Sequence, residues 1–240
     1  MAGHNKWSKI KRDKGVNDAK RGAVFTKIGN QIAIAARSGT DPNMNSALAM
    51  AIEKAKAANM PNTNIQRALD RASDKNAAVL EEITYEGYGH GGVGIIIETA
   101  TDNRNRTFPE VRNALIKNGG TIADAGSVAF QFTRKGVINV AATGEDALLT
   151  VLDAGAEDAV EEDGEIVVYT DQKELAKVRT AISEAGLEVT GAELQYIGNN
   201  MIEVADEETA TKLMKILDAL DDLDDVVNVF TNADITAEIE

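Results

Sequence analysis

The spacing of the apolar residues changes from a helical to a strand period near residue 79, and this change restricts the chain to a mixed α+β fold. Before that point, apolar side chains recur every three or four residues, as at Phe25, Ile28, Ile32 and Ala35. The pattern predicts three helices, at about 20–38, 45–58 and 63–71, separated by Gly and Pro breaks. Residues 1–78 are therefore expected to form a basic arm followed by a three-helix domain.

Beyond residue 79 the pattern is that of strands joined by short helices. Alternating runs at 83–88 and 93–100 flank the glycine-rich segment 87–94, which predicts a hairpin with a turn that needs positive φ. A capping box at 107–110 predicts a helix that ends at Gly119-Gly120, and 128–132 alternates like a strand.

Residues 136–197 have a complete βαββαβ order, which is the ferredoxin-like arrangement. The remaining pieces, strands at 201–204 and 226–230 and a helix at 206–220, cannot form a sheet alone, so they are expected to complete the layer begun at 80–134. The expected fold is α+β, with an N-terminal three-helix domain followed by two small α/β-sandwich (ferredoxin-like) domains. Residues 135–198 are predicted to be an inserted acidic domain, and 79–134 plus 199–240 a discontinuous one.

The charge of the chain is divided very unevenly along its length. The net charge is −14, yet residues 1–78 hold 14 Lys and Arg against 6 Asp and Glu, a net of +8. Residues 135–240 hold 6 against 26, a net of −20. Because salt screens charges over about 8–10 Å, the acidic half does not cancel the field at the surface of the basic half. Such asymmetry indicates nucleic-acid contact by the basic part.

Several classes of protein are excluded by what the sequence lacks. Without cysteine there is no disulfide framework and no thiolate zinc site. No apolar run reaches the roughly 20 residues that span a bilayer, and the basic first residues lack the apolar stretch of a signal peptide. A cytoplasmic location without membrane contact is expected. The oligomeric state stays open, with a monomer favoured.

Catalytic motifs are also missing. The two histidines, His4 and His90, stand alone, and no nucleophile elbow, phosphate-binding P-loop or HExxH motif occurs. The acidic clusters at 161–163 and 221–225 lack the spacing of a calcium loop and are typical of solvated turns. We therefore expect no enzyme activity, no cofactor and no metal.

The candidate binding residues are a dense group of cations with one tryptophan. Trp7 either stacks on a base or anchors the arm to the helices. Arg104 and Arg106, before the helix that Thr107 is expected to cap, suggest an anion that is either phosphate or a carboxylate of another domain. No sequence-reading motif is present. The expected nucleic-acid-binding residues are Lys6, Trp7, Lys9, Lys11, Arg12, Lys14, Lys20, Arg21, Lys27, Arg37, Arg104 and Arg106.

Five segments resemble the YebC family, which includes probable transcriptional regulators and the mitochondrial translational activator of cytochrome c oxidase. They are MAGHNKWSKIKRDKGVNDAKRGAVFTKI, AIEKAKAANMP, YEGYGHGGVGIIIE, TDNRNRT and GSVAFQF. The resemblance implies three domains, with the helical one as the nucleic-acid binder. The family usually has Pro where this chain has His90, and more Arg in the second helix than residues 45–50 offer.

Two functions follow from this resemblance. The first is a DNA-binding regulator of transcription. The alternative is a translation factor that associates with the ribosome and its RNA and activates or rescues peptide synthesis. The charge split bears on the choice, because a −20 segment is repelled by a long duplex and attracted by basic ribosomal proteins. The expected partners are therefore DNA or ribosomal RNA, and ribosomal proteins for the acidic domains.

Overall fold

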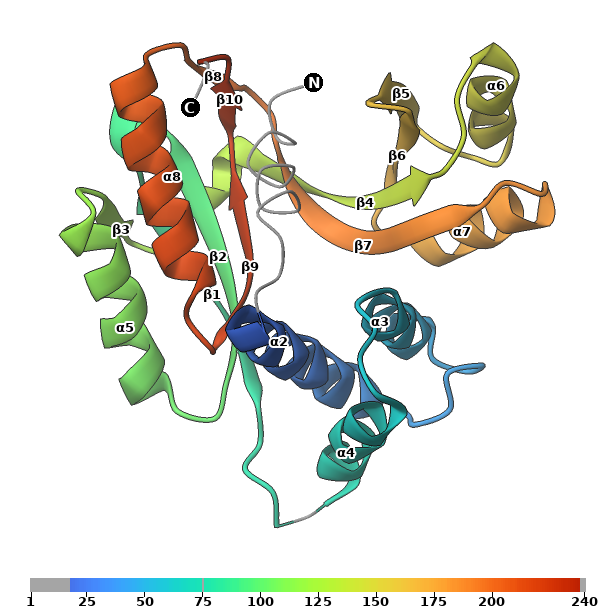
Figure 1. Cartoon of the computed structure of the whole chain (residues 1–240), viewed down its shortest axis with the longest axis horizontal. Coiled ribbons are helices and arrows are strands. Elements are labelled where there is room, and N and C mark those ends of the chain that lie inside the picture. Colours follow the sequence, from blue (N-terminus) through green and yellow to red (C-terminus); the bar gives the residue numbers. More distant parts are fainter. Residues whose placement is uncertain (1–17, 75, 238–240) are drawn as a thin grey trace.

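The computed structural model describes residues 18–74 and 76–237, and the N-terminal part of this range is helical (Figure 1). Its helices are α2 (Asp18–Ala36), α3 (Ser46–Ala57) and α4 (Asn62–Ser73). The Asn45 side chain caps α3 by accepting a hydrogen bond of 3.1 Å from the Leu48 amide. The third helix, predicted to begin at about residue 63, begins at Asn62 directly after Pro61, which makes no side-chain cap. The three helices share one apolar core around Ile32, Leu48, Ala55, Met60 and Ile65.

A four-stranded antiparallel sheet follows, with the strand order β3-β1-β2-β9. Its strands are β1 (Glu81–Tyr88), β2 (Gly94–Thr101), β3 (Thr121–Ala123) and β9 (Val226–Thr231). Helices α5 (Arg104–Lys117) and α8 (Glu207–Asp221) cover one face together (Figure 1). Ile95 and Ile97 of β2 pack there with Leu115 and Leu217, while Ile96 points to the opposite face and packs with Phe132.

A second four-stranded antiparallel sheet has the order β5-β6-β4-β7. Its strands are β4 (Phe132–Val140), β5 (Asp158–Glu162), β6 (Glu165–Asp171) and β7 (Val189–Gly198), with helices α6 (Glu145–Asp153) and α7 (Leu175–Glu184) between them. Ile138, Ile166 and Ile182 are fully buried where the two helices pack on the sheet. The chain is therefore an α+β protein with three N-terminal helices and two antiparallel sheets, each covered by helices.

Two predicted strands differ from the structure. The segment 128–132 is a 3₁₀ turn (Ala129–Gln131) that leads into β4, because its amides donate to the buried Glu86 carboxylate instead of to a strand. The segment 201–204 forms β8 (Ile202–Val204), which pairs in parallel with β10 (Ala233–Ile235) and not with the four-stranded sheet. Among the described residues, no helix combines the length and the apolar character needed to cross a membrane.

The helical region contacts both sheet regions (Figure 1). Lys54 of α3 forms an ion pair of 2.7 Å with Glu193 of β7, and Glu53 pairs with Arg179 of α7. On the other side, the Lys27 ammonium of α2 donates to the backbone carbonyl of Asp221, at the end of α8. Charged side chains of the helices thus contact both sheet regions, and Met50 of α3 also packs against the apolar core of the second sheet.

Candidate nucleic-acid interface

A groove of about 300 Å³ lies between α2 and α4. One stripe of α2 and one stripe of α4 line it, because the lining positions of each helix are three or four residues apart and so lie on one face. Met60, in the turn before α4, also lines the groove. The lining residues are Gly22, Phe25, Thr26, Gly29, Asn30, Met60, Asn64, Arg67, Ala68 and Arg71.

Two arginines one helical turn apart stand at this groove. Arg67 is exposed, and its Nη1 donates to Asn64 Oδ1 at 3.2 Å. Arg71 is half-buried, and its Nη1 donates to Asn30 Oδ1 at 3.3 Å. Asn30 is only 8% exposed, and its amide nitrogen Nδ2 makes no hydrogen bond within the described part of the chain. Guanidinium groups suit phosphate because their planar N–H groups match its oxygens.

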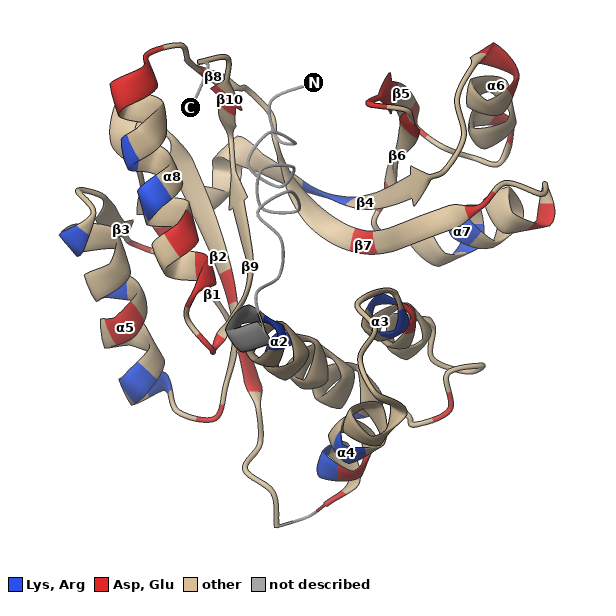
Figure 2. Ribbon diagram, in the orientation of Figure 1, with Lys and Arg blue, Asp and Glu red and all other residues tan. Residues whose placement is uncertain are grey.

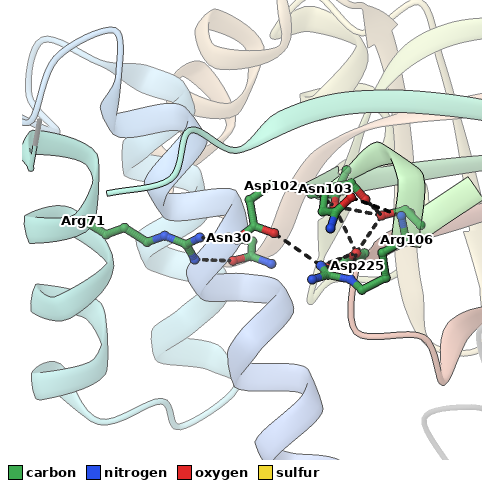
Figure 3. A network of polar contacts seen from close by, with 8 residues as sticks. Asn30, Arg71, Asp102, Asn103, Arg106 and Asp225 are labelled. Atoms are coloured by element: carbon green, nitrogen blue, oxygen red, sulfur yellow. Dashed lines mark hydrogen bonds and ion pairs between the residues drawn. The ribbon is translucent and has the colours of Figure 1, made fainter. Parts of the chain in front are cut away.

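Arg71 also starts a polar network that leaves the helical region (Figure 3). Its Nη2 lies 3.5 Å from Asp102, which follows β2, and Asp102 lies 3.4 Å from Arg106 of α5. Arg106 in turn donates to both carboxylate oxygens of Asp225, at 2.9 and 2.7 Å. The network therefore joins α4 and α2 to the first sheet and its helix.

Asp225 is the buried end of this network. Its Oδ2 accepts hydrogen bonds from Thr107 at 2.7 Å and from Thr101 at 3.0 Å, in addition to Arg106. Burial alone raises the pKa of this carboxyl, but the hydrogen bonds from Thr107, Arg106 and Thr101 outweigh it, so the pKa is lowered. Asp225 therefore stays ionised as a fixed anion at the start of α5.

The helix start predicted at Thr107 is wrong by one turn. The N-cap of α5 is Asn103, whose side chain accepts from the Arg106 amide at 3.2 Å, and the helix begins at Arg104. Thr107 therefore lies inside the helix. Its hydroxyl does not cap the helix, because it donates to the Asp225 carboxylate and to the Asn103 carbonyl. Arg104 and Arg106 are thus in the first helical turn, where Glu81 and Asp225 offset their unfavourable interaction with the helix dipole.

The other sequence-predicted residues fall into two groups. Lys6, Trp7, Lys9, Lys11, Arg12 and Lys14 lie outside the described residues, and so does the side chain of Lys20 in the first turn of α2. Arg21 is exposed on α2, whereas Lys27 is buried against Asp221. Arg37 donates to the Leu80 carbonyl at 2.8 Å, which ties the end of α2 to the segment before β1.

Sequence reasoning missed the four polar residues of the groove, which are Asn30, Asn64, Arg67 and Arg71. The available signal was the spacing of Asn64, Arg67 and Arg71, which puts them on one face of α4. It was overlooked because the denser cations of residues 6–27 dominate the charge count. Asn30 had no signal in the sequence, since its role depends on α2 packing against α4.

The remaining sequence features are the acidic clusters, the glycine-rich turn and His90. Within the described ranges, no group of three or more His, Asp or Glu side chains is arranged to hold a metal ion. Gly91 and Gly92 of the glycine-rich turn adopt φ of 74° and 76°. Glycine is found at both positions because other residues rarely adopt this backbone conformation. The His90 ring nitrogen Nε2 lies 2.9 Å from the Asn118 carbonyl oxygen, at the end of α5.

Charged residues are distributed differently over the described regions. Figure 2 shows Lys and Arg on α3 and α4 and also on α5 and in the middle of α8, and Asp and Glu concentrated on β5, near α6 and at the two ends of α8. The groove between α2 and α4 lies in a region where cations outnumber anions, with 8 Lys and Arg against 5 Asp and Glu in residues 18–74.

Comparisons with known proteins agree over the whole length of the chain. The model of the TACO1/YebC protein N-terminal domain matches residues 5–75, and that of the TACO1/YebC second and third domain matches residues 80–233. A probable transcriptional regulatory protein of Herpetosiphon aurantiacus is 46% identical over 245 residues, covering 100% of this chain and 97% of the relative. One of Moorella thermoacetica is 47% identical over 246 residues, covering 100% and 98%.

A solved structure is also similar. The crystal structure of the conserved hypothetical protein Aq1575 from Aquifex aeolicus matches with a TM-score of 0.86 and 40% identity, covering 92% of this chain and 93% of that one. The fold, the two matching family models and the full-length relatives agree. This chain belongs to the TACO1/YebC family.

Proposed function

We propose that this protein is a nucleic-acid-binding regulator of gene expression, with DNA as its first candidate target. The observation that carries the proposal is the arginine pair, Arg67 and Arg71, at a groove of the region whose net charge is +8. The names of the relatives, probable transcriptional regulatory proteins, support regulation as the role.

Binding in this proposal is mainly electrostatic. Phosphate contacts by Lys and Arg release counterions, so the logarithm of the affinity falls with the logarithm of the salt concentration by about 0.9 per phosphate on duplex DNA. Arg21, Arg67 and Arg71 act together with the cations of residues 6–20. Lys27 and Arg106 are assigned to the stability of the fold, because their charged groups bond to Asp221 and Asp225. Sequence readout is not part of the proposal.

The test compares the binding of a promoter duplex and a scrambled duplex by fluorescence anisotropy between 50 and 200 mM salt. Arg67→Ala with Arg71→Ala is expected to reduce the salt slope by up to about 2, one unit for each lost phosphate contact. Arg112→Ala, which removes an exposed arginine of α5, is the matched control and should leave the slope unchanged. An unchanged slope for the double variant, or no binding by the wild type, would contradict the proposal.

A ribosome-associated role in translation is the second candidate, and one observation favours it. The acidic residues of the second sheet region, which Figure 2 shows on β5 and near α6, would repel a long duplex and attract basic ribosomal proteins. In this version, residues 135–198 are an inserted ferredoxin-like domain that faces protein, and residues 1–78 contact RNA. Cosedimentation with ribosomes at low salt tests it, since a protein absent from the ribosomal pellet would exclude this role.

A further inference from the structure

We propose that the groove between α2 and α4 holds one unpaired nucleotide of a single-stranded segment, with the base on the apolar floor and the phosphate at Arg67 and Arg71. The inference rests on the proposed function and makes it more specific. It assigns the groove a substrate class, single-stranded nucleic acid, in addition to the contact that Arg67 and Arg71 make with a duplex backbone in the proposed function.

The composition of the groove fits the parts of a nucleotide. Phe25, Met60 and Ala68 provide an aromatic and aliphatic floor for the flat face of a base. Asn30 and Asn64 provide amide groups for the polar edge of a base, and the Nδ2 of Asn30 makes no hydrogen bond within the described part of the chain. A volume of about 300 Å³ is at the lower end for small-ligand pockets, which suits one nucleotide and is too small for a base pair to enter.

Two glycines of α2 add an independent argument. Gly22 and Gly29 are two helical turns apart, and both line the groove. Glycine within a helix is unfavourable relative to alanine, so a packing reason is expected where it occurs. Among the described residues, no such packing reason is found. Within that part of the chain, a Cβ at Gly22 would meet no atom within 4 Å, and a Cβ at Gly29 would meet Met60 Cε at 3.8 Å and Ala68 Cβ at 4.0 Å, which are ordinary contacts.

These glycines therefore keep space open that the packing of the described residues does not require. Alanine at either position would fit and would strengthen the helix, but it would narrow the groove. Alanine at these positions would thus increase the stability of the helix but reduce the space for a ligand. Such a conflict between stability and binding is expected at a ligand site.

The experiment measures the full-length chain and variants of Gly29 against three fluorescent or competing probes. These are a mixed-sequence single strand of about 12 nucleotides, the duplex of the same sequence, and adenosine monophosphate as a competitor. The wild type is expected to bind the single strand more tightly than the duplex. Gly29→Leu should weaken single-strand binding by about tenfold, because the base loses its place on the floor, and should change duplex binding by less than twofold.

Gly29→Ala guards against a variant that fails to fold. Its melting temperature should rise by about 2–4 °C while its affinity for the single strand falls. Gln66→Leu places similar bulk on an exposed position of α4 outside the groove and should change neither probe's affinity. A direct readout is the NMR signal of the Met60 methyl group, which should shift when the single strand is added, while that of Met44, 87% exposed and away from the groove, should not.

The outcomes separate this inference from the proposed function. Equal single-strand affinities of wild type and both Gly29 variants, with duplex binding intact, would overturn the nucleotide site and leave nucleic-acid binding standing. A shift of the Met60 methyl signal on addition of adenosine monophosphate, without any single-strand binding, would make the groove a site for a free nucleotide and would also overturn the inference. A wild type that binds neither the single strand nor the duplex would overturn the proposed function itself.

Discussion

At the scale of single residues, Asp225 connects α5 to the sheet that it covers. Its carboxylate accepts hydrogen bonds from Thr101, Arg106 and Thr107, and its side chain is 11% exposed. Hydrogen bonds to a charged group contribute about 1.5–3 kcal/mol each when they are well formed. Replacing this residue should therefore affect the stability of the fold more than replacing a surface carboxylate.

We predict that Asp225→Asn lowers the free energy of unfolding by about 2 kcal/mol at pH 7, because an amide NH₂ group would face donors instead of accepting from them. The lowered pKa fixes the pH dependence. The stabilisation is present above about pH 3.9, the ordinary carboxyl pKa, and is lost as the pH falls through the lowered one. Denaturant unfolding at pH 7 and pH 3 tests this, with Asp124→Asn, an exposed carboxylate, as the control. A difference between wild type and variant that persists undiminished at the lowest pH would contradict it.

Glu98 should behave in the opposite way. Burial raises its pKa, and the hydrogen bond from Asn228 and the charge of Arg134 only partly offset this effect. A raised pKa means that the folded protein holds the proton longer than the unfolded chain, so stability falls as the pH rises from about 4.3 through the folded pKa. Glu98→Gln is predicted to raise the free energy of unfolding at pH 7 and to match the wild type below about pH 4. Glu184→Gln, on the exposed end of α7, should show no change at either pH.

These residue-level partners were only partly predictable from the sequence. Arg104 and Arg106 were expected to face an anion, and Glu81 and Asp225 supply carboxylates. The identity of the partner was beyond the sequence, because Asp225 follows Thr107 by more than a hundred residues and meets it only through the pairing of β2 with β9. The capping prediction failed for the same reason, since the Thr107 hydroxyl is used by a distant group.

At the scale of elements, the loop before β4 is shaped by one buried carboxylate. Glu86 of β1 is 6% exposed and accepts backbone hydrogen bonds from Gly126, Val128 and Ala129 at 2.6, 2.6 and 2.8 Å. Tyr88 adds a hydrogen bond of 2.9 Å to the Ser127 carbonyl. The alternating pattern of 128–132 could not predict this loop, because the spacing of apolar side chains does not show which acceptors the backbone amides bond to.

We predict that Glu86→Gln destabilises the protein by about 2 kcal/mol, since its amide nitrogen would oppose amide donors in a buried place. The effect should be local, so hydrogen exchange of the Val128 and Ala129 amides should accelerate more than that of the β6 amides. Glu82→Gln, at the exposed end of the same strand, is the matched control. Uniform acceleration across both sheets would instead indicate that the loop has no separate stability.

Regular elements were predicted more fully than the groove. Local spacing suffices for the helices and for the hairpin of β1 and β2, both of which are confirmed. It does not suffice for β8, whose partner β10 lies about thirty residues away. Of the groove, only the polar face of α4 can be predicted from the sequence. The glycines of α2 that line the other side cannot be recognised as lining residues until the packing of the two helices is known.

At the scale of the whole molecule, ion pairs join the helical region to both sheets, and one of them competes with the proposed ligand. Arg71 lies at the groove and also 3.5 Å from Asp102, in a pair whose side chains are about one third exposed. A phosphate at Arg71 must therefore compete with a carboxylate of the neighbouring region. Nucleic-acid binding and the attachment of the helical region to the first sheet are thus expected to oppose each other.

Asp102→Asn tests this competition. Exposed ion pairs contribute about 0.2–1 kcal/mol, so releasing Arg71 should increase affinity for nucleic acid by no more than about fivefold at low salt, and by less at 200 mM. Asp74→Asn, after the end of α4, removes the same charge from an exposed residue and is the control for a general change in net charge. If both variants bind equally tightly, only the net charge matters. If Asp102→Asn alone gains affinity, and α4 amides also exchange faster in its free form, the contact that holds the helices to the sheet is the same contact that restrains binding.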